Sequence, residues 1–233
     1  MSKIDPINYY TKSYNKPAIG VLDWVSKNDL RYYKDYLSDG QYEIINKSLR
    51  NGSRVDFFIK GIIEGIDRIF DSIPKGYLTK RNEVVYRGIN TNNLPKELEE
   101  IITLKGKTNI FVDKAFTSTS EKKEIAKQFK GQNGILLKIN LPPGAKRLKA
   151  TDFSHLFKSE EEITLPRNSE FRVESYDERS RTAVLTYLGQ KKPIPEVEEL
   201  SKVEIELENI SDYKKNILKN NKFKNNMDFK FSN

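Results

Sequence analysis

The chain contains no cysteine and only one histidine, His155, among its 233 residues. These absences exclude a disulfide framework and a cysteine-ligated zinc or iron–sulfur site, and a Ser-His-Asp or Cys-His catalytic set would depend on that one imidazole. We therefore expect carboxylates, arginines and hydroxyl groups to carry out any chemistry, without a bound metal.

Long apolar runs are missing as well. No stretch approaches the run of about 20 apolar residues that a membrane-spanning helix requires, and residues 1–20 lack the apolar centre of a secretory signal peptide. We expect a soluble protein without a membrane span. If it is secreted or delivered into another cell, it travels after removal of a leader or by a route that the chain does not show, and an intracellular role stays open.

Positive charge is in excess, since 41 Lys and Arg residues face 33 Asp and Glu residues and leave a net charge of +8. Such a charge attracts phosphates, nucleic acids or acidic protein surfaces but identifies no function. A basic nucleic-acid-binding or interaction module, with the Lys-rich residues 214–230 on phosphates, is the non-enzymatic alternative. No heptad, zinc-finger or RNA-binding aromatic motif supports it.

Apolar periodicity divides the chain into a helical first part and a strand-rich second part. Between residues 22 and 70 apolar side chains recur every three or four positions, which indicates helices. Helices followed by strands predict an α+β fold. We predict strands at 83–87, 109–116, 134–141, 162–165, 169–174 and 181–188, and helices at 94–103 and 121–130, the latter capped by Ser120.

These changes in composition predict one domain with flanking segments. The acidic segment 191–210 contains alternating apolar and Glu positions, which are typical of an edge strand, and the last 23 residues carry six Lys and six Asn, which favours a disordered tail or a marginal amphipathic helix. The predicted parts are an N-terminal arm (1–21), the domain (22–190, helical in 22–73 and strand-rich in 74–190), the acidic segment (191–210) and the tail (211–233).

Three short motifs occur at predicted strand ends: Tyr86-Arg87-Gly88, Phe116-Thr117-Ser118-Thr119-Ser120 and Glu160-Glu161-Glu162. Each alone is weak evidence, because Glu-x-Glu occurs five times in the chain. In this order they resemble the Arg, Ser-Thr-Ser, Glu-x-Glu signature of bacterial toxin-type mono-ADP-ribosyltransferases. The run from Glu162 to Val173 is similar to one in binary actin-modifying toxins and Rho-modifying exoenzymes, and residues 30–52 look like the helical segment that precedes their catalytic core.

The resemblance covers roughly residues 22–190. It implies a helical layer followed by an ADP-ribosyltransferase core of two packed, mainly antiparallel sheets. It also implies that NAD is consumed as a substrate, that no metal is needed, and that ADP-ribose passes to a protein such as actin or another host protein. A separate binding or delivery component is a further partner that the resemblance suggests.

The chemistry of NAD explains why the motif residues belong together. NAD joins a dianionic pyrophosphate to a nicotinamide-ribose whose glycosidic bond breaks through an oxocarbenium-like state. The resemblance implies that Arg87 binds phosphate or ribose oxygens of NAD. It also implies that Glu162 accepts a hydrogen bond from the ribose and stabilises the positive charge that develops on the sugar. Ser118 and Thr119 would orient that carboxylate, and Gly88 would let the backbone approach nicotinamide closely.

The resemblance also implies roles for Phe129 and Glu160. Phe129 lies where related toxins have an aromatic in the loop over the nicotinamide and phosphates. The family often has an Arg a few residues further on, whereas here the local cation is Lys130. Glu160 points to an arginine acceptor, because the family pairs Glu at this position with arginine and Gln with asparagine on Rho-like GTPases. If the segment is extended, Glu160 and Glu162 project to the same side, and Glu160 would bind or deprotonate the guanidinium.

Several alternatives stay open. Glu160 is a solvated loop charge in the plainer interpretation, and Phe153 or Phe157 either docks a protein target or packs in the core. His155 receives no role. The same site would serve an NAD glycohydrolase with water as the acceptor, a transferase for a residue other than arginine, or an inactive interaction domain.

Overall fold

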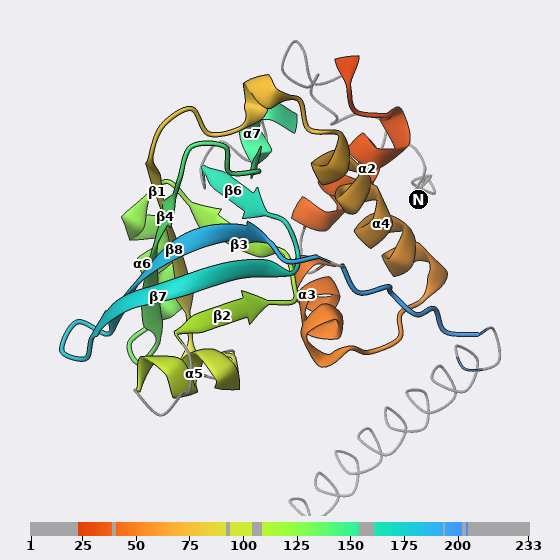
Figure 1. Cartoon of the computed structure of the whole chain (residues 1–233). Coiled ribbons are helices and arrows are strands. Elements are labelled where there is room, and N and C mark those ends of the chain that lie inside the picture. Colours follow the sequence, from red (N-terminus) through yellow and green to blue (C-terminus); the bar gives the residue numbers. More distant parts are fainter. Residues whose placement is uncertain are drawn as a thin grey trace, which may run out of the picture.

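The computed structural model describes residues 23–38, 41–91, 94–103, 109–153, 161–192, 194–201 and 204. Three helices, α2 (Lys27–Leu37), α3 (Gln41–Asn51) and α4 (Phe57–Ser72), form a layer on one side of the strand-rich part (Figure 1). Ser26 Oγ accepts the backbone N–H of Asp29 at 3.1 Å, and Asp56 Oδ1 accepts that of Ile59 at 2.8 Å, so polar side chains cap the N-termini of α2 and α4.

The helical layer buries its apolar face against the sheet. One core cluster unites buried residues of the three helices with Phe116, Leu148 and Phe153 from the strand-rich part. Phe153 packs edge-to-face on Tyr33 with ring centroids 4.7 Å apart and is buried, so the structure supports its interpretation as a core residue.

Eight strands form the sheet, with the order β2-β7-β8-β4-β1-β3-β6-β5. All described pairs are antiparallel except β4 with β8, which is parallel. The strands are β1 (Glu83–Ile89), β2 (Ile110–Asp113), β3 (Thr117–Ser120), β4 (Ile135–Leu141), β5 (Leu148–Lys149), β6 (Glu162–Leu165), β7 (Ser169–Asp177) and β8 (Thr182–Gln190). The α+β class and the mainly antiparallel pairing are therefore confirmed.

The two groups of strands expected as two sheets are joined into one. Strands β1 and β3 connect them through a single paired position, Tyr86 opposite Ser120. Side chains from both groups still meet in one apolar cluster, because Val85 and Leu185 on one side and Ile163 on the other belong to it. The β1–β3 pairing therefore joins the strand group β2-β7-β8-β4-β1 to the group β3-β6-β5.

Four shorter helices complete the described fold: η2 (Lys75–Tyr77), α5 (Lys96–Ile102), α6 (Lys123–Lys130) and α7 (Ala150–Phe153). The prediction that Ser120 caps α6 is wrong, because Lys122 occupies the N-cap and makes no side-chain cap bond. Ser120 Oγ instead accepts the backbone N–H of Lys122 at 3.0 Å in the turn before the helix. The predicted strand 109–116 is shorter than expected, because β2 ends at Asp113.

The segment 194–201 crosses the helical layer. Val55 and Glu199 form an isolated parallel bridge, in which Val55 N–H donates to Glu198 O at 3.0 Å and Leu200 N–H donates to Val55 O at 2.7 Å. The alternating stretch 203–208 of the predicted edge strand, apart from Glu204, the predicted arm 1–21 and the predicted tail 211–233 lie outside the described residues. Among the helices that the structure describes, none is long and apolar enough to cross a membrane.

Candidate functional site

Three neighbouring strands bring Arg87, Ser118 and Glu162 together. Arg87 lies on β1, Ser118 on β3 and Glu162 at the start of β6, and these strands are adjacent in the order β1-β3-β6. Arg87 Nη1 donates to the backbone oxygen of Ser118 at 3.2 Å. Burial, and then the charge of Arg50, lower the pKa of Arg87, while the charges of Asp113, Tyr36 and Glu162 act in the opposite direction.

The helical layer contributes a buried phenol to this group. The Tyr36 hydroxyl lies 3.1 Å from Ser118 Oγ, and Asn46 Nδ2 donates to the Tyr36 oxygen at 3.0 Å. Burial first, and then the negative charge of Glu162, raise the pKa of Tyr36 to about 12. Tyr36 therefore stays protonated at neutral pH and acts as a hydrogen-bonding group.

A second buried phenol lies beside the first. The Tyr33 ring stacks on Tyr36 with centroids 6.2 Å apart, and its hydroxyl lies 2.9 Å from Thr164 Oγ1 on β6. Burial and the charge of Glu162 raise the pKa of Tyr33 well above its ordinary value. Both tyrosines thus link α2 to the strands that carry Ser118 and Glu162.

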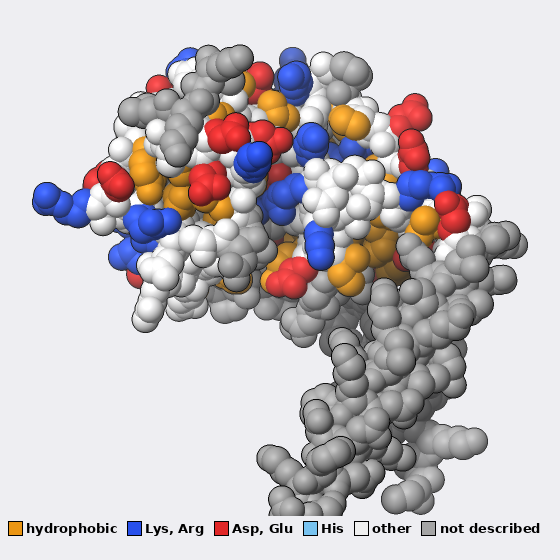
Figure 2. Space-filling model, turned by 90° about the horizontal axis from the view of Figure 1, so that it is seen from below, with side chains coloured by type: hydrophobic (Ala, Val, Ile, Leu, Met, Phe, Trp, Pro, Cys, Tyr) orange, Lys and Arg blue, Asp and Glu red, His pale blue; other side chains and the backbone are white. Residues whose placement is uncertain are grey.

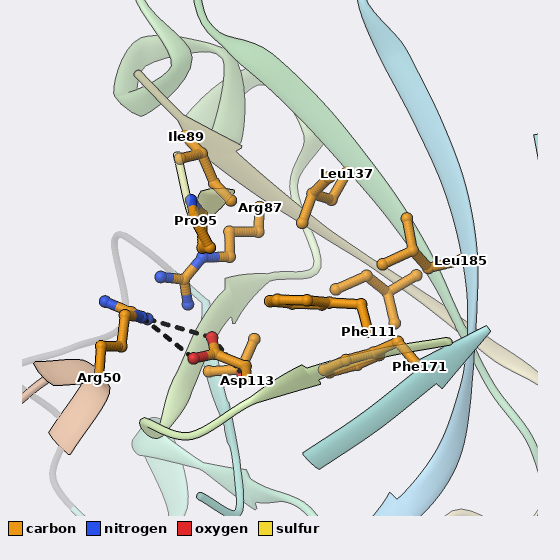
Figure 3. A pocket seen from close by; sticks show the side chains of 11 residues that line it. Arg50, Arg87, Ile89, Pro95, Phe111, Asp113, Leu137, Phe171 and Leu185 are labelled. Atoms are coloured by element: carbon orange, nitrogen blue, oxygen red, sulfur yellow. Dashed lines mark hydrogen bonds and ion pairs between the residues drawn. The ribbon is translucent and has the colours of Figure 1, made fainter. Parts of the chain in front are cut away.

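A buried carboxylate lies between two arginines (Figure 3). Arg50 from α3 donates from Nε and Nη2 to the two oxygens of Asp113, at 3.0 and 3.1 Å. Burial opposes ionisation of Asp113, but the charges of Arg50 and Arg87 hold the pKa of that carboxyl below its ordinary value. Arg50, Arg87 and Asp113 together therefore carry one net positive charge.

Apolar side chains form the wall behind the arginines. Figure 3 shows them around Arg87, on β1, β2, β4, β7 and β8 and, at Pro95, directly before α5. Such a wall excludes water and strengthens electrostatic interactions with any ligand at the arginines. The apolar lining residues are Ile89, Pro95, Phe111, Leu137, Ile139, Phe171 and Leu185.

Other predicted site residues lie elsewhere. Thr119 is buried on the face of β3 opposite to Ser118, and its Oγ1 donates to Ile163 O at 2.7 Å. Phe129 lies on α6 and is 53% exposed. A Cβ on Gly88 would lie 1.9 Å from the Ala126 carbonyl oxygen, so the space beside Gly88 is taken up by α6.

The expectation that Glu160 and Glu162 lie in an extended segment and project to the same side needs correction. Glu161 has a φ of 44°, in the left-handed region, so the segment is not extended there and simple alternation does not place Glu160 beside Glu162. Glu161 is held by the backbone N–H of Glu121, 3.3 Å from its carbonyl oxygen, and by Lys122 Nζ, 2.9 Å from its carboxylate. Glu160, His155 and Phe157 lie outside the described residues.

The sequence interpretation missed five residues of this group. Tyr36, Asn46 and Arg50 belong to the helical segment on which the resemblance was noted, but no role was assigned to them. Tyr33 lies in the same segment, where it fits the apolar period of the helices and indicates a core residue. No sequence pattern identifies Asp113 as a site residue, because a lone Asp at a strand end is also typical of an ordinary turn.

The comparison with protein families decides the assignment. The family described as ADP-ribosyltransferase exoenzyme matches residues 8–225 of the chain. The chain belongs to this family. A search of curated proteins found no match.

Solved structures share the fold of this family member. Exoenzyme S from Pseudomonas aeruginosa, solved with human 14-3-3 protein beta and carba-NAD, has a TM-score of 0.57 and 18% identity over 70% of this chain and 75% of its own. The C3 exoenzyme of Clostridium limosum has a TM-score of 0.54 and 20% identity over 72% of this chain and 87% of its own. The toxin BECa of Clostridium perfringens, solved with NADH, has a TM-score of 0.53 and 20% identity over 72% of this chain and 45% of its own.

Proposed function

We propose that this exoenzyme transfers ADP-ribose from NAD to an arginine side chain of a protein target. Membership of the ADP-ribosyltransferase exoenzyme family supports the transfer reaction. The observation that carries the proposal is the meeting of Arg87, Ser118 and Glu162 on β1, β3 and β6, with Arg50 held beside them by the buried carboxylate of Asp113.

The charges of the site fit a dinucleotide. Arg87 and Arg50 offer two guanidinium groups in front of an apolar wall, and a guanidinium matches the oxygens of a pyrophosphate bidentately. In two of the solved relatives a nicotinamide dinucleotide or an analogue is bound, which supports NAD as the substrate here. We propose that Arg87 anchors the phosphates or ribose and that the backbone at Gly88 borders the nicotinamide.

The hydrogen bonds around Ser118 bear on the direction in which its hydroxyl donates its proton. The Tyr36 oxygen already accepts a bond from Asn46, and we propose that the Tyr36 hydroxyl donates its proton to Ser118 Oγ. Ser118 then keeps its own proton to donate to a carboxylate or to a ribose hydroxyl. We propose that this arrangement orients Glu162 toward the sugar.

In the proposed reaction Glu162 stabilises the positive charge that develops on the ribose as neutral nicotinamide leaves. An arginine nitrogen of the target then forms a bond to the anomeric carbon from the opposite face and gives up one proton, so the β-linkage of NAD becomes an α-linkage. We assign the capture of the guanidinium and its proton to Glu160, from the family pattern. Thr119 and Phe129 act less directly, from the core and from the surface of α6.

The toxin relatives support release from the producing cell or delivery into another one. The target would be a host protein with an exposed arginine, such as actin, with or without a separate delivery component. On the face seen in Figure 2 the described Lys and Arg side chains are interspersed with Asp and Glu, a mixture that favours a protein surface over a nucleic-acid backbone as the partner there.

The test combines NAD with agmatine or polyarginine and measures ADP-ribosylation by mass spectrometry and nicotinamide release by chromatography. We expect the wild type to modify the arginine acceptor, Glu162→Gln to lose both activities, and Glu160→Gln to release nicotinamide without transfer. Glu100→Gln, at an exposed carboxylate of α5, is the matched control and should behave as the wild type.

Other outcomes select the alternatives. Nicotinamide release without transfer to any acceptor indicates an NAD glycohydrolase. Transfer to a protein at a residue other than arginine refutes the acceptor assignment. If the wild type neither binds nor cleaves NAD, and salt-sensitive nucleic-acid binding depends on residues 214–230, the non-enzymatic alternative replaces the proposal.

A further inference from the structure

Asp113 accepts hydrogen bonds from four groups. Its Oδ1 accepts from Arg50 Nε at 3.0 Å and from the backbone N–H of Ala115 at 3.1 Å. Its Oδ2 accepts from Arg50 Nη2 and from Thr117 Oγ1, both at 3.1 Å. With 5% of its surface exposed, the carboxylate is fixed between helix α3 and the turn that leads into β3.

This arrangement holds Arg50 in one orientation. A bidentate pair with a fixed carboxylate removes most of the rotational freedom of a long guanidinium side chain. The pair uses Nε and Nη2, and among the described residues no hydrogen-bond partner of Arg50 Nη1 is found. Figure 3 shows Arg87 approaching the same carboxylate from β1, so one anion faces both guanidinium groups.

We propose that Asp113 is a positioning residue that orients Arg50 and limits the repulsion between Arg50 and Arg87, so that both guanidinium groups face the diphosphate of NAD. This inference rests on the proposed function, because it assigns to the two arginines the binding of that substrate. Without the anion, two like charges remain on adjacent elements, and each would turn toward solvent.

The chain offers a matched control for this buried pair. Arg167 donates to both oxygens of Asp67, from Nε at 2.8 and 3.1 Å, and both side chains are largely buried. This pair joins α4 to the turn between β6 and β7, and it contains neither Arg50 nor Arg87. Asp67→Asn therefore reports the cost of breaking a buried ion pair in the same fold.

The experiment measures NAD affinity by calorimetry and nicotinamide release at varied NAD concentration. In Asp113→Asn we expect Kd and KM for NAD to rise about tenfold or more, with kcat changed less, because the lost interaction serves substrate binding. In an Arg50→Gln background the same substitution should raise KM by a clearly smaller factor, since Asp113 acts through Arg50. Asp67→Asn should lower the melting temperature and leave KM unchanged.

Asp113→Glu provides the test if Asp113→Asn does not fold. It keeps the charge but moves it by one methylene, so a positioning role predicts a raised Kd for NAD in a folded protein, as judged by circular dichroism. A wild-type Kd in a folded Asp113→Asn or Asp113→Glu variant overturns the inference and leaves the proposed function intact. If the wild type itself does not bind NAD, both fail.

Discussion

The hydroxyl of Tyr36 lies 3.1 Å from Ser118 Oγ and connects the helical layer to strand β3. Tyr36 is fully buried, and its oxygen also accepts a hydrogen bond from Asn46. The catalytic hydroxyl that we assign to Ser118 is therefore oriented by a residue from another layer of the fold. The helices thus contribute polar groups as well as core packing.

Tyr36→Phe removes both hydrogen bonds while keeping the ring. We expect a loss of about 1–2 kcal/mol in the free energy of unfolding, because buried Asn46 loses its partner. Nicotinamide release should fall about tenfold, because Ser118 loses the donor that directs its proton. Urea denaturation and the release assay measure the two effects.

Tyr187→Phe is the matched control for this change. Tyr187 is buried on β8 and forms its hydrogen bond with Ser169, outside the group around Ser118. We expect a similar loss of stability with unchanged nicotinamide release. Equal activity of Tyr36→Phe and Tyr187→Phe would contradict the orienting role of Tyr36.

High pH should destabilise the fold through its buried tyrosines. Burial raises the pKa of both Tyr36 and Tyr187 to about 12, whereas the unfolded chain titrates near 10. Their stabilising contribution is complete below pH 10 and is lost between about pH 10 and 12, because the unfolded chain then releases protons that the folded protein retains. Each tyrosine contributes about 2–3 kcal/mol to this loss.

Urea denaturation at a series of pH values from 8 to 11.5 measures this dependence. The free energy of unfolding should stay level to about pH 9 and then decline as the unfolded tyrosines ionise. In Tyr187→Phe the decline should be shallower, since one of the shifted groups is gone. An identical decline in the variant would show that other groups control alkaline unfolding.

Gly88 tests how closely α6 approaches β1. A Cβ at this position would lie 1.9 Å from Ala126 O and 2.4 Å from Lys130 N, both backbone atoms. Gly88→Ala must therefore displace α6, and we expect destabilisation of at least 1–3 kcal/mol, roughly the cost of overpacking. In Gly76→Ala the new methyl group meets nothing within 4 Å, so thermal melting should distinguish the two variants clearly.

Much of the fold was predictable because its signals are local. The β-branched and aromatic run at 83–87 predicts β1, which the structure extends to Ile89, and the three motifs at predicted strand ends lie on strands that are adjacent in the sheet. Helical periodicity gave the layer of α2, α3 and α4. Each of these inferences depends on residues within one element or on motif order.

The missed features depend on contacts between distant parts of the chain. Asp113 acquires its role only when α3 brings Arg50, 63 positions away in sequence, against it. The reason for glycine at position 88 is the backbone of α6, which no pattern within β1 reveals. The single β1–β3 pairing that unites the strands likewise follows from tertiary packing.

Glu161 directly precedes β6 and has an unusual backbone conformation. It adopts a φ of 44° although it is not glycine, a conformation that costs about 1–3 kcal/mol unless its surroundings hold it. Asn tolerates this conformation, whereas a β-branched residue does not. Glu161→Asn and Glu161→Val both remove the ion pair with Lys122, so a comparison of the two isolates the backbone effect.

We expect Glu161→Asn to retain most of its stability, because an exposed ion pair contributes only about 0–1 kcal/mol. Glu161→Val should be about 1–2 kcal/mol less stable than the Asn variant and should release nicotinamide more slowly, because a relaxed backbone at position 161 shifts the neighbouring Glu162. Denaturation curves and the release assay make the comparison. Equal stability and activity in the two variants would mean that the left-handed conformation does not help to position Glu162.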